Sequence, residues 1–589
     1  MSTSKPTVII VGSGAGGAMA AYQLTKDGHQ VLLLEAGRDY DPKTETPMFR
    51  RNHQAPLMAA GTPDKDFGYF DATVDGGWQV PDEPYTSAEG SEFMWWRARM
   101  LGGRTNHWGR YALRFSEHDF KGKSRDGLGA DWPFEYADIA PWYDKTEALV
   151  GVCGTNTGLD DMPPSPEGVL QPPPVARVPE LLVAAAAKKL GITAVPMHRA
   201  VLTRPLDNRA ACFYATPCGH GCAIGAAFQT TTSLLPMAVA TGNLQIQTNA
   251  MVKRVDTNEQ GQVTGVTYID KKTGQEQQLV APVVILAASA CESARILLNS
   301  ASSKHPNGLA NSSGQVGKNL MDSTGANLSA LVPSLQGRPR YNEDGHTANH
   351  LFIPWWGHQA QQRKELNFPR GYHFELGGRF SEPSAYVSGN LQGYGKALKQ
   401  QVTANYGAVV SFALRGEMLP NEHCYMDIDP KVTDKWGIPV ARFHWRWSEH
   451  EIKQVQHGLN TAKEILTLMG ATVGELPKPE DAILKGGQII HEVGTTRMGA
   501  NPKESVTNQW GQTWDCPNLF VMDGGVFASN PHKNCTLTIM TLAMRNSSWL
   551  SEQLKTGQLK AGQLNANQLN ASQLNARAPK AGQVEQGVI

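Results

Sequence analysis

The first forty residues alternate between apolar runs and a glycine-rich turn. Residues 8–11 read VIIV and residues 31–34 read VLLL, which is the unbroken apolar pattern of strands buried on both faces of a sheet. Between these runs, residues 15–26 lack proline and end shortly before Gly28, which predicts a helix with a glycine stop. The chain therefore begins with a predicted strand–helix–strand unit.

The turn after the first predicted strand carries the glycines of a phosphate-binding motif. Gly12, Gly14 and Gly17 have the G-x-G-x-x-G spacing. The first glycine turns the chain, the second lets backbone amides approach a pyrophosphate, and the third lets the helix pack against the strand. Glu35 ends the second strand, where a carboxylate can accept hydrogen bonds from ribose hydroxyls. We expect a bound dinucleotide, FAD or NAD, rather than an unliganded glycine turn.

Further along the chain, three patterns predict other kinds of structure. Residues 423–451 alternate apolar and polar positions around DKWG, which predicts antiparallel strands joined by a turn. The Pro-rich residues 171–179 predict a surface link. From Gln553 to Leu574 the pair QL recurs every five residues, which is not a helical period. Residues 551–589 are therefore expected to form a low-complexity, disordered tail, with a docking segment for a partner subunit as the alternative.

Composition excludes several classes of function. The 54 Lys and Arg balance the 54 Asp and Glu, which gives no indication of nucleic-acid binding or an anionic membrane surface. No run of eighteen apolar residues predicts a transmembrane span. The N-terminus shows no signal-peptide pattern, so we expect a cytoplasmic protein, with co-export to the periplasm alongside a signal-bearing partner as the alternative. Eight cysteines are too few for a disulfide scaffold.

Four later motifs, together with the glycine turn, resemble the glucose–methanol–choline (GMC) oxidoreductase family. They are LGGRTNHWGR at 101–110, VVILAASACESARILLNS at 283–300, HEVGTTRMG at 491–499 and NLFVMDGGVFASNPHKNCTLTIMTLAMR at 518–545. The resemblance runs from the first strand to about residue 548 and implies stably held FAD and oxidation of an alcohol by hydride transfer. Cys291 and Ala294 occupy a segment where the family usually carries glycine and proline. We expect the flavin contact there to survive, because it is largely a main-chain contact.

The resemblance also implies a fold and a division into domains. The fold class is α/β, with a Rossmann-type FAD-binding domain and an α+β substrate domain built on an antiparallel sheet, to which the 423–451 strands look similar. The FAD-binding domain would be discontinuous and comprise residues 1–50, 95–125, 200–325 and 490–548. The cap and substrate-binding regions would comprise residues 51–94, 126–199 and 326–489.

Several residues are expected to contact the flavin because they match family motifs. They are Gly103, Asn106, His107, Asp523 and, through its backbone near the adenine, Val252. In some family members a histidine in the region of His107 is bonded covalently to the flavin. A packing or simple contact role for His107 is the alternative.

Two positions match the catalytic pair of the family. His491 matches the base histidine, and a neutral imidazole near pH 7 can accept the hydroxyl proton. Asn534 matches the second position, where its amide can hydrogen-bond the substrate oxygen. His491 could instead be a core histidine, and Asn534 could cap the helix that follows it. His532, two residues before Asn534, is a competing candidate for the base.

Cys212, Cys218 and Cys222 form a C-x5-C-x3-C cluster in a chain that is otherwise poor in cysteine. Zinc sites and four-iron clusters usually take four protein ligands, whereas three thiolates suit a 3Fe-4S cluster. Neighbouring glycines would let the loop fold around it. The spacing resembles that of bacterial FAD-dependent glucose dehydrogenase catalytic subunits and fructose dehydrogenase of this family, and glucoside 3-dehydrogenases belong to the same group. Buried thiols that serve as core residues are the alternative, with a disulfide less favoured.

The sequence therefore predicts an FAD-dependent dehydrogenase that oxidises a hydroxyl of a sugar or glycoside. Electrons would pass through the 3Fe-4S cluster to a separate acceptor, a cytochrome or quinone-linked partner or a small partner subunit. The first rival is an oxidase that reduces oxygen and has no cluster. The second is a non-catalytic flavoprotein subunit, which the matches at His491 and Asn534 disfavour.

Overall fold

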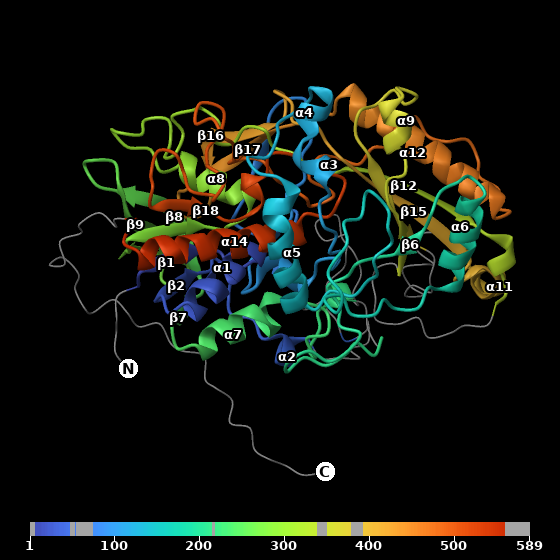
Figure 1. Cartoon of the computed structure of the whole chain (residues 1–589), viewed down its shortest axis with the longest axis horizontal. Helices are drawn as coiled ribbons and strands as arrows, with labels where there is room; N and C mark the ends of the chain where they lie inside the picture. The colour runs from blue at the N-terminus through green and yellow to red at the C-terminus, as the bar shows by residue number, and fades with distance from the viewer. Residues whose placement is uncertain are drawn as a thin grey trace, which may run out of the picture.

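The structure is a computed structural model that describes residues 6–46, 54, 75–214, 218–338, 350–377 and 393–559. Two large sheets organise these residues. In Figure 1 a parallel sheet and its helices occupy the left half of the molecule, and an antiparallel sheet with α6 and α12 occupies the right half.

The parallel sheet contains five strands in the order β18–β11–β1–β2–β7. These strands are β18 (Leu519–Val521), β11 (Val283–Leu286), β1 (Val8–Val11), β2 (Val31–Leu34) and β7 (Leu244–Gln247). Every residue of β1 pairs with β11 on one side and with β2 on the other. Strands enclosed in this way are buried on both faces, which is why their sequences are unbroken apolar runs. The predicted strand–helix–strand unit is confirmed.

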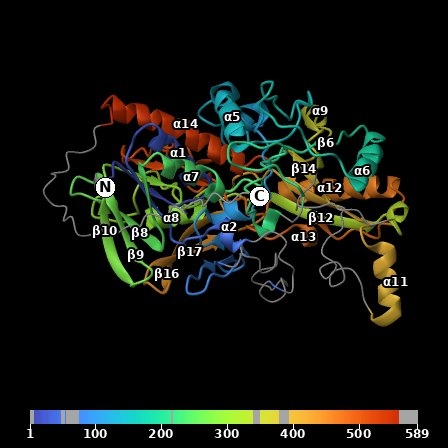
Figure 2. The ribbon, with the colours of Figure 1, turned by 90° about the horizontal axis from the view of Figure 1, so that it is seen from below.

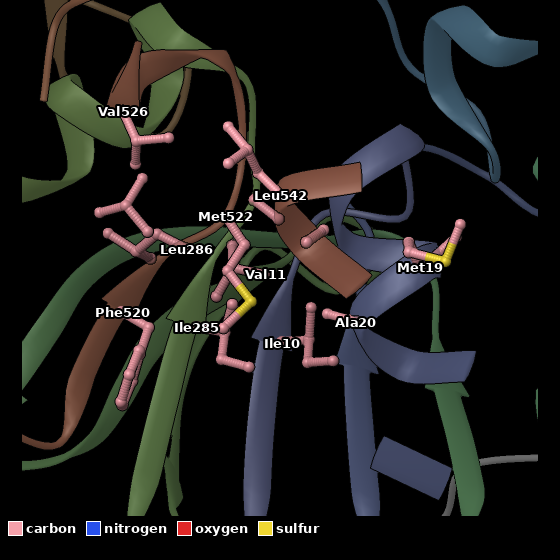
Figure 3. Packing of buried hydrophobic residues seen from close by; sticks show 14 of the residues in the cluster. Ile10, Val11, Met19, Ala20, Ile285, Leu286, Phe520, Met522, Val526 and Leu542 are labelled. Carbon is pink, nitrogen blue, oxygen red and sulfur yellow. The ribbon is translucent and has the colours of Figure 1, made fainter. Parts of the chain in front are cut away.

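Helices cover one face of the parallel sheet and a small antiparallel sheet covers the other, as Figure 2 shows. The helices are α1 (Ala15–Lys26), α14 (Thr536–Lys555) and α7 (Leu234–Ala240). The small sheet consists of β8 (Ala250–Thr257), β9 (Val263–Asp270) and β10 (Gln275–Val280). Figure 3 shows side chains of β1, β11 and β18 packed with those of α1 and α14. The core therefore joins the two ends of the sequence.

The antiparallel sheet has the order β12–β15–β14–β13–β6. Its strands are β12 (Thr324–Leu331), β15 (Val409–Gly416), β14 (Tyr372–Gly377), β13 (Leu351–Ile353) and β6 (Val195–Pro196). The helices α12 (Glu449–Leu468) and α6 (Val178–Lys188) pack with it around a second apolar core. Phe374 and Phe412 belong to this core, so the alternate residues His373 and Glu375 of β14 face the other way.

The hairpin predicted in residues 423–451 is confirmed, but it belongs to a different sheet. Strands β16 (Tyr425–Thr433) and β17 (Pro439–His444) pair with each other and with β4 (Thr86–Ser87), not with the five-stranded antiparallel sheet. A buried ion pair from Arg295 of α8 (Ala290–Leu298) to Asp434, at 2.9 Å, joins the hairpin to the helix that follows β11 of the parallel sheet. The similarity to the substrate-domain sheet was therefore wrong for this segment.

Further elements connect these layers. They include α2 (Pro42–Glu45), β3 (Gly76–Gly77), β5 (Arg97–Ala98), α3 (Glu117–Phe120), α4 (Gly122–Asp126), α5 (Tyr136–Val150), α9 (His358–Gln362), α11 (Gly395–Asn405) and α13 (Pro479–Ala482). Helix α14 continues to Lys555, so the first residues of the expected tail are helical, and residues 560–589 lie outside the described part. Among the described helices, none combines the length and the apolar character needed to cross a bilayer.

Candidate active site

The carboxyl ends of the parallel strands bring the predicted nucleotide-binding residues to one edge of the sheet. Of these, Gly12 follows β1, Glu35 follows β2 and Asp523 lies two residues after β18; Ser289, which was not predicted, lies three residues after β11. Ligands of open α/β sheets bind at this edge. The four segments are far apart in the sequence and meet only because their strands are neighbours.

The glycine turn leaves open space at one position only. A Cβ on Gly12, whose φ is +101°, would lie 2.4 Å from the carbonyl oxygen of Ala287, and one on Gly17 would lie 1.9 Å from that of Gly12. A Cβ on Gly14 would meet no atom within 4 Å. Gly14 is also the N-cap of α1, where unpaired backbone N–H groups face outward. This open space beside a helix N-terminus fits a pyrophosphate.

Glu35 is held in place by the turn that it faces. Its carboxylate accepts hydrogen bonds from the Ser13 backbone nitrogen at 3.1 Å, from the Ser13 hydroxyl and from the Gly37 backbone nitrogen at 2.8 Å. A carboxylate can accept about four hydrogen bonds, which leaves room for a ribose hydroxyl. The Glu35 carbonyl accepts from Ala250 at 2.9 Å, and this contact places the buried Val252 of β8 beside the same end of the site.

The 101–107 segment lies against the glycine turn. The Gly102 backbone nitrogen donates to the Ser13 hydroxyl at 2.8 Å, and a Cβ on Gly103 would be 4.0 Å from the Gly14 Cα atom. The buried Asn106 donates to the Leu101 carbonyl at 2.9 Å. The predicted flavin-contact residues Gly103 and Asn106 are therefore adjacent to the predicted phosphate position.

His107 and Asp523 are fixed by neighbouring side chains. The Trp96 indole donates to Nε2 of His107 at 3.0 Å. Asp523 accepts from the Ser293 hydroxyl at 2.5 Å and from the Gly525 backbone nitrogen at 2.8 Å. Burial raises the pKa of the Asp523 carboxyl to about 6. A covalent bond between His107 and the flavin stays a prediction.

The two predicted catalytic residues meet in the structure. Nδ2 of Asn534 lies 3.4 Å from Nε2 of His491 and 3.2 Å from Oε1 of Glu375. A carboxylate only accepts hydrogen bonds, so the amide nitrogen must face Glu375 and the amide oxygen must point away. That oxygen is buried and has no hydrogen-bond partner among the described residues. Cys535, not Asn534, is the N-cap of α14, so the helix-cap alternative is not what the structure shows.

His491 has a defined hydrogen-bonding pattern. Its Nδ1 lies 2.9 Å from the Ser323 hydroxyl, and its Nε2 faces the Asn534 amide, which can only donate there. This pattern places the ring proton on Nδ1 and a lone pair on Nε2. Burial, reinforced by the charge of Arg415, lowers the pKa of His491 to about 3. The imidazole is therefore neutral at pH 7 and can act as a base through Nε2.

His532 belongs to a neighbouring buried cluster, which approaches the site through His373, whose Nε2 lies 3.7 Å from Oε1 of Glu375. Its Nε2 lies 3.3 Å from Asp161, and the Lys533 ammonium bridges Asp161 and Asp119 at 2.8 Å each. Its Nδ1 lies 3.4 Å from Nδ1 of His373. Burial lowers the pKa of His532 to about 4. No contact between His532 and His491 is present among the described residues, and Asn534 pairs with His491.

Four polar residues of the site were not found from the sequence. They are Asp322, Ser323, Glu375 and Arg415. Glu375 lies 3.4 Å from Arg415 of the neighbouring strand β15. The polar alternate positions of β14 were a usable signal for Glu375, because a strand with one apolar face and polar residues on the other often borders a site. Asp322 and Ser323 carry no comparable local pattern.

The three clustered cysteines lie together next to Arg110, at the end of the 101–110 segment. Cys212, Cys218 and Cys222 share one small apolar cluster, and none of the eight cysteines, all described, forms a disulfide. Burial, with the neighbouring thiols, raises the pKa of Cys212 to about 12. Among the described residues, which omit 215–217, no group of three His, Cys, Asp or Glu side chains is already arranged to hold a metal ion.

A fully buried arginine connects the loop that carries the three cysteines to the 101–107 segment. Arg110 donates to the Cys218 carbonyl at 2.8 Å and to the Asn106 carbonyl at 2.9 Å. Within the described part of the chain its guanidinium bonds only backbone carbonyls and forms no ion pair with a carboxylate. Burial lowers the pKa of Arg110 to about 10. The three cysteine side chains and the adjacent Arg110 guanidinium suit metal binding by thiolates, because the negative charge of the thiolates would offset the positive charge of Arg110.

Comparison with known proteins agrees with this architecture. Two family profiles described as GMC oxidoreductase match residues 7–324 and 420–543. The chain is 32% identical to 2-methyl-1,2-propanediol dehydrogenase of Mycolicibacterium austroafricanum, over 94% of this chain and 96% of the relative. It is 26% identical to the fructose dehydrogenase large subunit of Gluconobacter japonicus, over 94% and 99%.

A solved structure shares the fold. Pyridoxine 4-oxidase from Mesorbium loti aligns with a TM-score of 0.63 and 16% identity, covering 93% of this chain and 99% of that chain. The α/β architecture with its second, antiparallel sheet is thus the GMC fold. Profiles, relatives and fold agree, and the chain belongs to the GMC oxidoreductase family as an FAD-dependent oxidoreductase.

Proposed function

We propose that this protein oxidises a hydroxyl group of a sugar, glycoside or related polyol, with His491 as the base. The observation that carries the proposal is the pairing of Nε2 of a neutral His491 with the Asn534 amide at 3.4 Å. Bound FAD would supply the hydride acceptor. Gly12, Gly14, Gly17, Glu35, Gly103, Asn106, His107, Val252 and Asp523 are the residues that we propose to hold it.

The residues of the pair have separate tasks in this proposal. Nε2 of His491 would accept the proton of the substrate hydroxyl, while bound FAD would supply the acceptor for the hydride from the same carbon, so that the CH–OH group would become a carbonyl. Asn534 has one amide hydrogen on Glu375, so its second hydrogen can move from His491 to the substrate oxygen. Ser323 accepts from Nδ1 of His491 and keeps the lone pair on Nε2. Together these contacts orient the hydroxyl and its proton.

The substrate class is supported by the relatives and by the charged pair beside Asn534. By their names, one relative acts on a vicinal diol and another on fructose. Glu375 and Arg415 would offer this chain an acceptor and donors for hydroxyl groups next to the one oxidised. We therefore place the substrate among molecules with several hydroxyls.

Anaerobic flavin bleaching tests this function. The panel would contain 2-methyl-1,2-propanediol, D-fructose, D-glucose and methyl glucoside. We expect at least one to reduce the wild-type flavin and His491→Ala to lower that rate by about 100- to 10,000-fold with flavin retained. His532→Ala is the matched control and should reduce the rate far less. A His491→Ala protein that is reduced at the wild-type rate would exclude His491 as the base.

We further propose that Cys212, Cys218 and Cys222 bind a 3Fe-4S cluster that relays electrons to a cytochrome, a quinone-linked acceptor or a small partner subunit. The gathering of three thiols, the buried Arg110 and the match to a protein named as a large subunit support this. The three thiols, all in described residues, would have to come into a metal-binding arrangement that the structure does not show. Iron-free protein with rapid oxygen consumption would favour the oxidase alternative instead.

A further inference from the structure

A buried carboxylate holds the backbone on both sides of the residue that precedes His491. Asp322 is fully buried. Its Oδ1 accepts a hydrogen bond from the His491 backbone nitrogen at 2.9 Å, and its Oδ2 accepts from the Ile489 backbone nitrogen at 3.2 Å. The two oxygens therefore bracket Ile490.

Ile490 has a backbone conformation that its side chain disfavours. Its φ is +66°, in the left-handed region. A β-branched residue is a genuine outlier there, and such residues persist only where their surroundings enforce the conformation. Backbone N–H groups around a left-handed residue form a concave nest that binds an anion. In this protein the Asp322 carboxylate is that anion.

The same short segment holds the histidine ring. Met321 and Val493 exchange backbone hydrogen bonds at 3.0 Å, which aligns the two segments. The Ser323 hydroxyl lies 2.9 Å from Nδ1 of His491. Residues 321–323 thus fix the backbone before and after His491 as well as its ring, and the direction of Nε2 toward Asn534 depends on them.

We propose that Asp322 is a positioning residue whose carboxylate keeps Ile490 in the left-handed conformation and thereby aims Nε2 of His491 at the substrate hydroxyl. This inference rests on the proposed role of His491 as the base. In this proposal Asp322 acts on the loop and not on the substrate, because its side chain is fully buried and its oxygens accept hydrogen bonds from the loop backbone. It adds to the proposed function the residue that orients the base.

Two substitutions separate this role from a general effect on folding. Asp322→Asn keeps one oxygen that can accept from one of the two backbone N–H groups. It places an amide nitrogen, which only donates, opposite the other. Ile490→Gly removes the penalty of the left-handed conformation. If the carboxylate serves to enforce that conformation, adding Ile490→Gly to Asp322→Asn should restore the rate of flavin reduction. Asp434→Asn is the matched control, since Asp434 is also buried and accepts from the Trp436 and Ile438 backbone nitrogens at 2.9 Å.

Three readouts on the full-length FAD-loaded protein test the inference. Hydrogen–deuterium exchange of a peptide covering 485–497 should be faster in Asp322→Asn. Anaerobic flavin reduction by whichever alcohol of the panel reduces the wild type should fall roughly 10- to 100-fold per bound flavin, the loss expected for one charge-assisted hydrogen bond. The double variant should recover most of that rate. Asp434→Asn should lower stability and leave the rate per flavin unchanged.

The pH dependence supplies the third readout. Burial, with the charge of Glu492, raises the pKa of the Asp322 carboxyl to about 7. Arg104 faces Glu492 at 2.6 Å, and His491 and Cys535 complete the titratable surroundings. Protonation removes an accepting lone pair, so wild-type flavin reduction should fall as pH drops through 7. His491, whose pKa lies near 3, stays neutral over that range. In Asp322→Asn the rate of flavin reduction should no longer fall as the pH drops through 7.

The outcomes distinguish the inference from the function on which it rests. A panel that never reduces the wild-type flavin, or an unaffected His491→Ala protein, would refute the proposed function, and the exchange data would then decide the loop contact alone. Unchanged exchange in Asp322→Asn would refute the carboxylate's hold on the loop. Faster exchange with an unchanged rate per flavin, or a double variant as slow as Asp322→Asn, would refute the positioning role.

Discussion

Replacing Gly14 with alanine should weaken flavin binding without disturbing the fold. The φ of Gly14 is −68°, which alanine adopts readily, and the added Cβ would meet no protein atom within 4 Å. The methyl group would instead occupy the space assigned to the pyrophosphate. Because alanine is a somewhat poorer N-cap than glycine, the apoprotein should lose about 1 kcal/mol or less of unfolding free energy.

The expected loss of affinity follows from the contact that the methyl group breaks. A pyrophosphate oxygen pushed away from the first turn of α1 loses a backbone hydrogen bond to a charged group. Such a bond contributes about 1.5–3 kcal/mol. The dissociation constant of FAD should therefore rise about 10- to 150-fold. Titration of apoprotein with FAD, followed by flavin fluorescence, measures it directly.

Two neighbouring glycines are matched controls for this prediction. Gly17→Ala would place its Cβ 1.9 Å from the Gly12 carbonyl oxygen, so it should cost about 1–3 kcal/mol or more and damage folding as well as binding. Gly28→Ala, at φ +93° with open space around it, should cost about 1–2 kcal/mol and leave FAD affinity unchanged. A Gly14→Ala protein that binds FAD as tightly as the wild type would refute the assignment of this space to the pyrophosphate.

Two further predictions concern the active-site pair and the cysteine loop. Glu375→Gln should lower flavin reduction about tenfold while flavin content stays constant, because the new amide can donate to Asn534 and rotate it; an unchanged rate would show that Glu375 does not orient Asn534. Wild-type protein made with ample iron and protected from air should contain about three irons per flavin, and Cys218→Ser should lose iron and cytochrome reduction but keep substrate-dependent flavin bleaching. Iron-free wild-type protein would refute the cluster, and Cys153→Ser, in a buried cysteine outside the loop, is the control.

Local sequence patterns determined the nucleotide-binding half of this protein. The apolar runs of β1 and β2 and the glycine spacing between them predicted α1 at its observed bounds, Ala15–Lys26. They succeeded because each signal acts over a few residues: strand burial, helix stop and the contacts that exclude a side chain at Gly12 and Gly17. The family motifs supplied His491 and Asn534 in the same way.

The tertiary structure decided which distant residues join these motifs. The hairpin β16–β17 alternates like any half-buried hairpin, and the ion pair from Arg295 to Asp434, with hydrogen bonds from Arg295 and Asn299 to the Pro439 carbonyl, places it against α8. Asp322 and Glu375 reach the proposed catalytic pair from segments separated from it by more than a hundred residues. The pattern of apolar and polar residues along the chain does not predict such contacts, because they depend on how the sheets pack and not on which residues are neighbours in the sequence. The sequence determined by itself the phosphate turn and the candidates for catalysis, and only the packing decided what orients them.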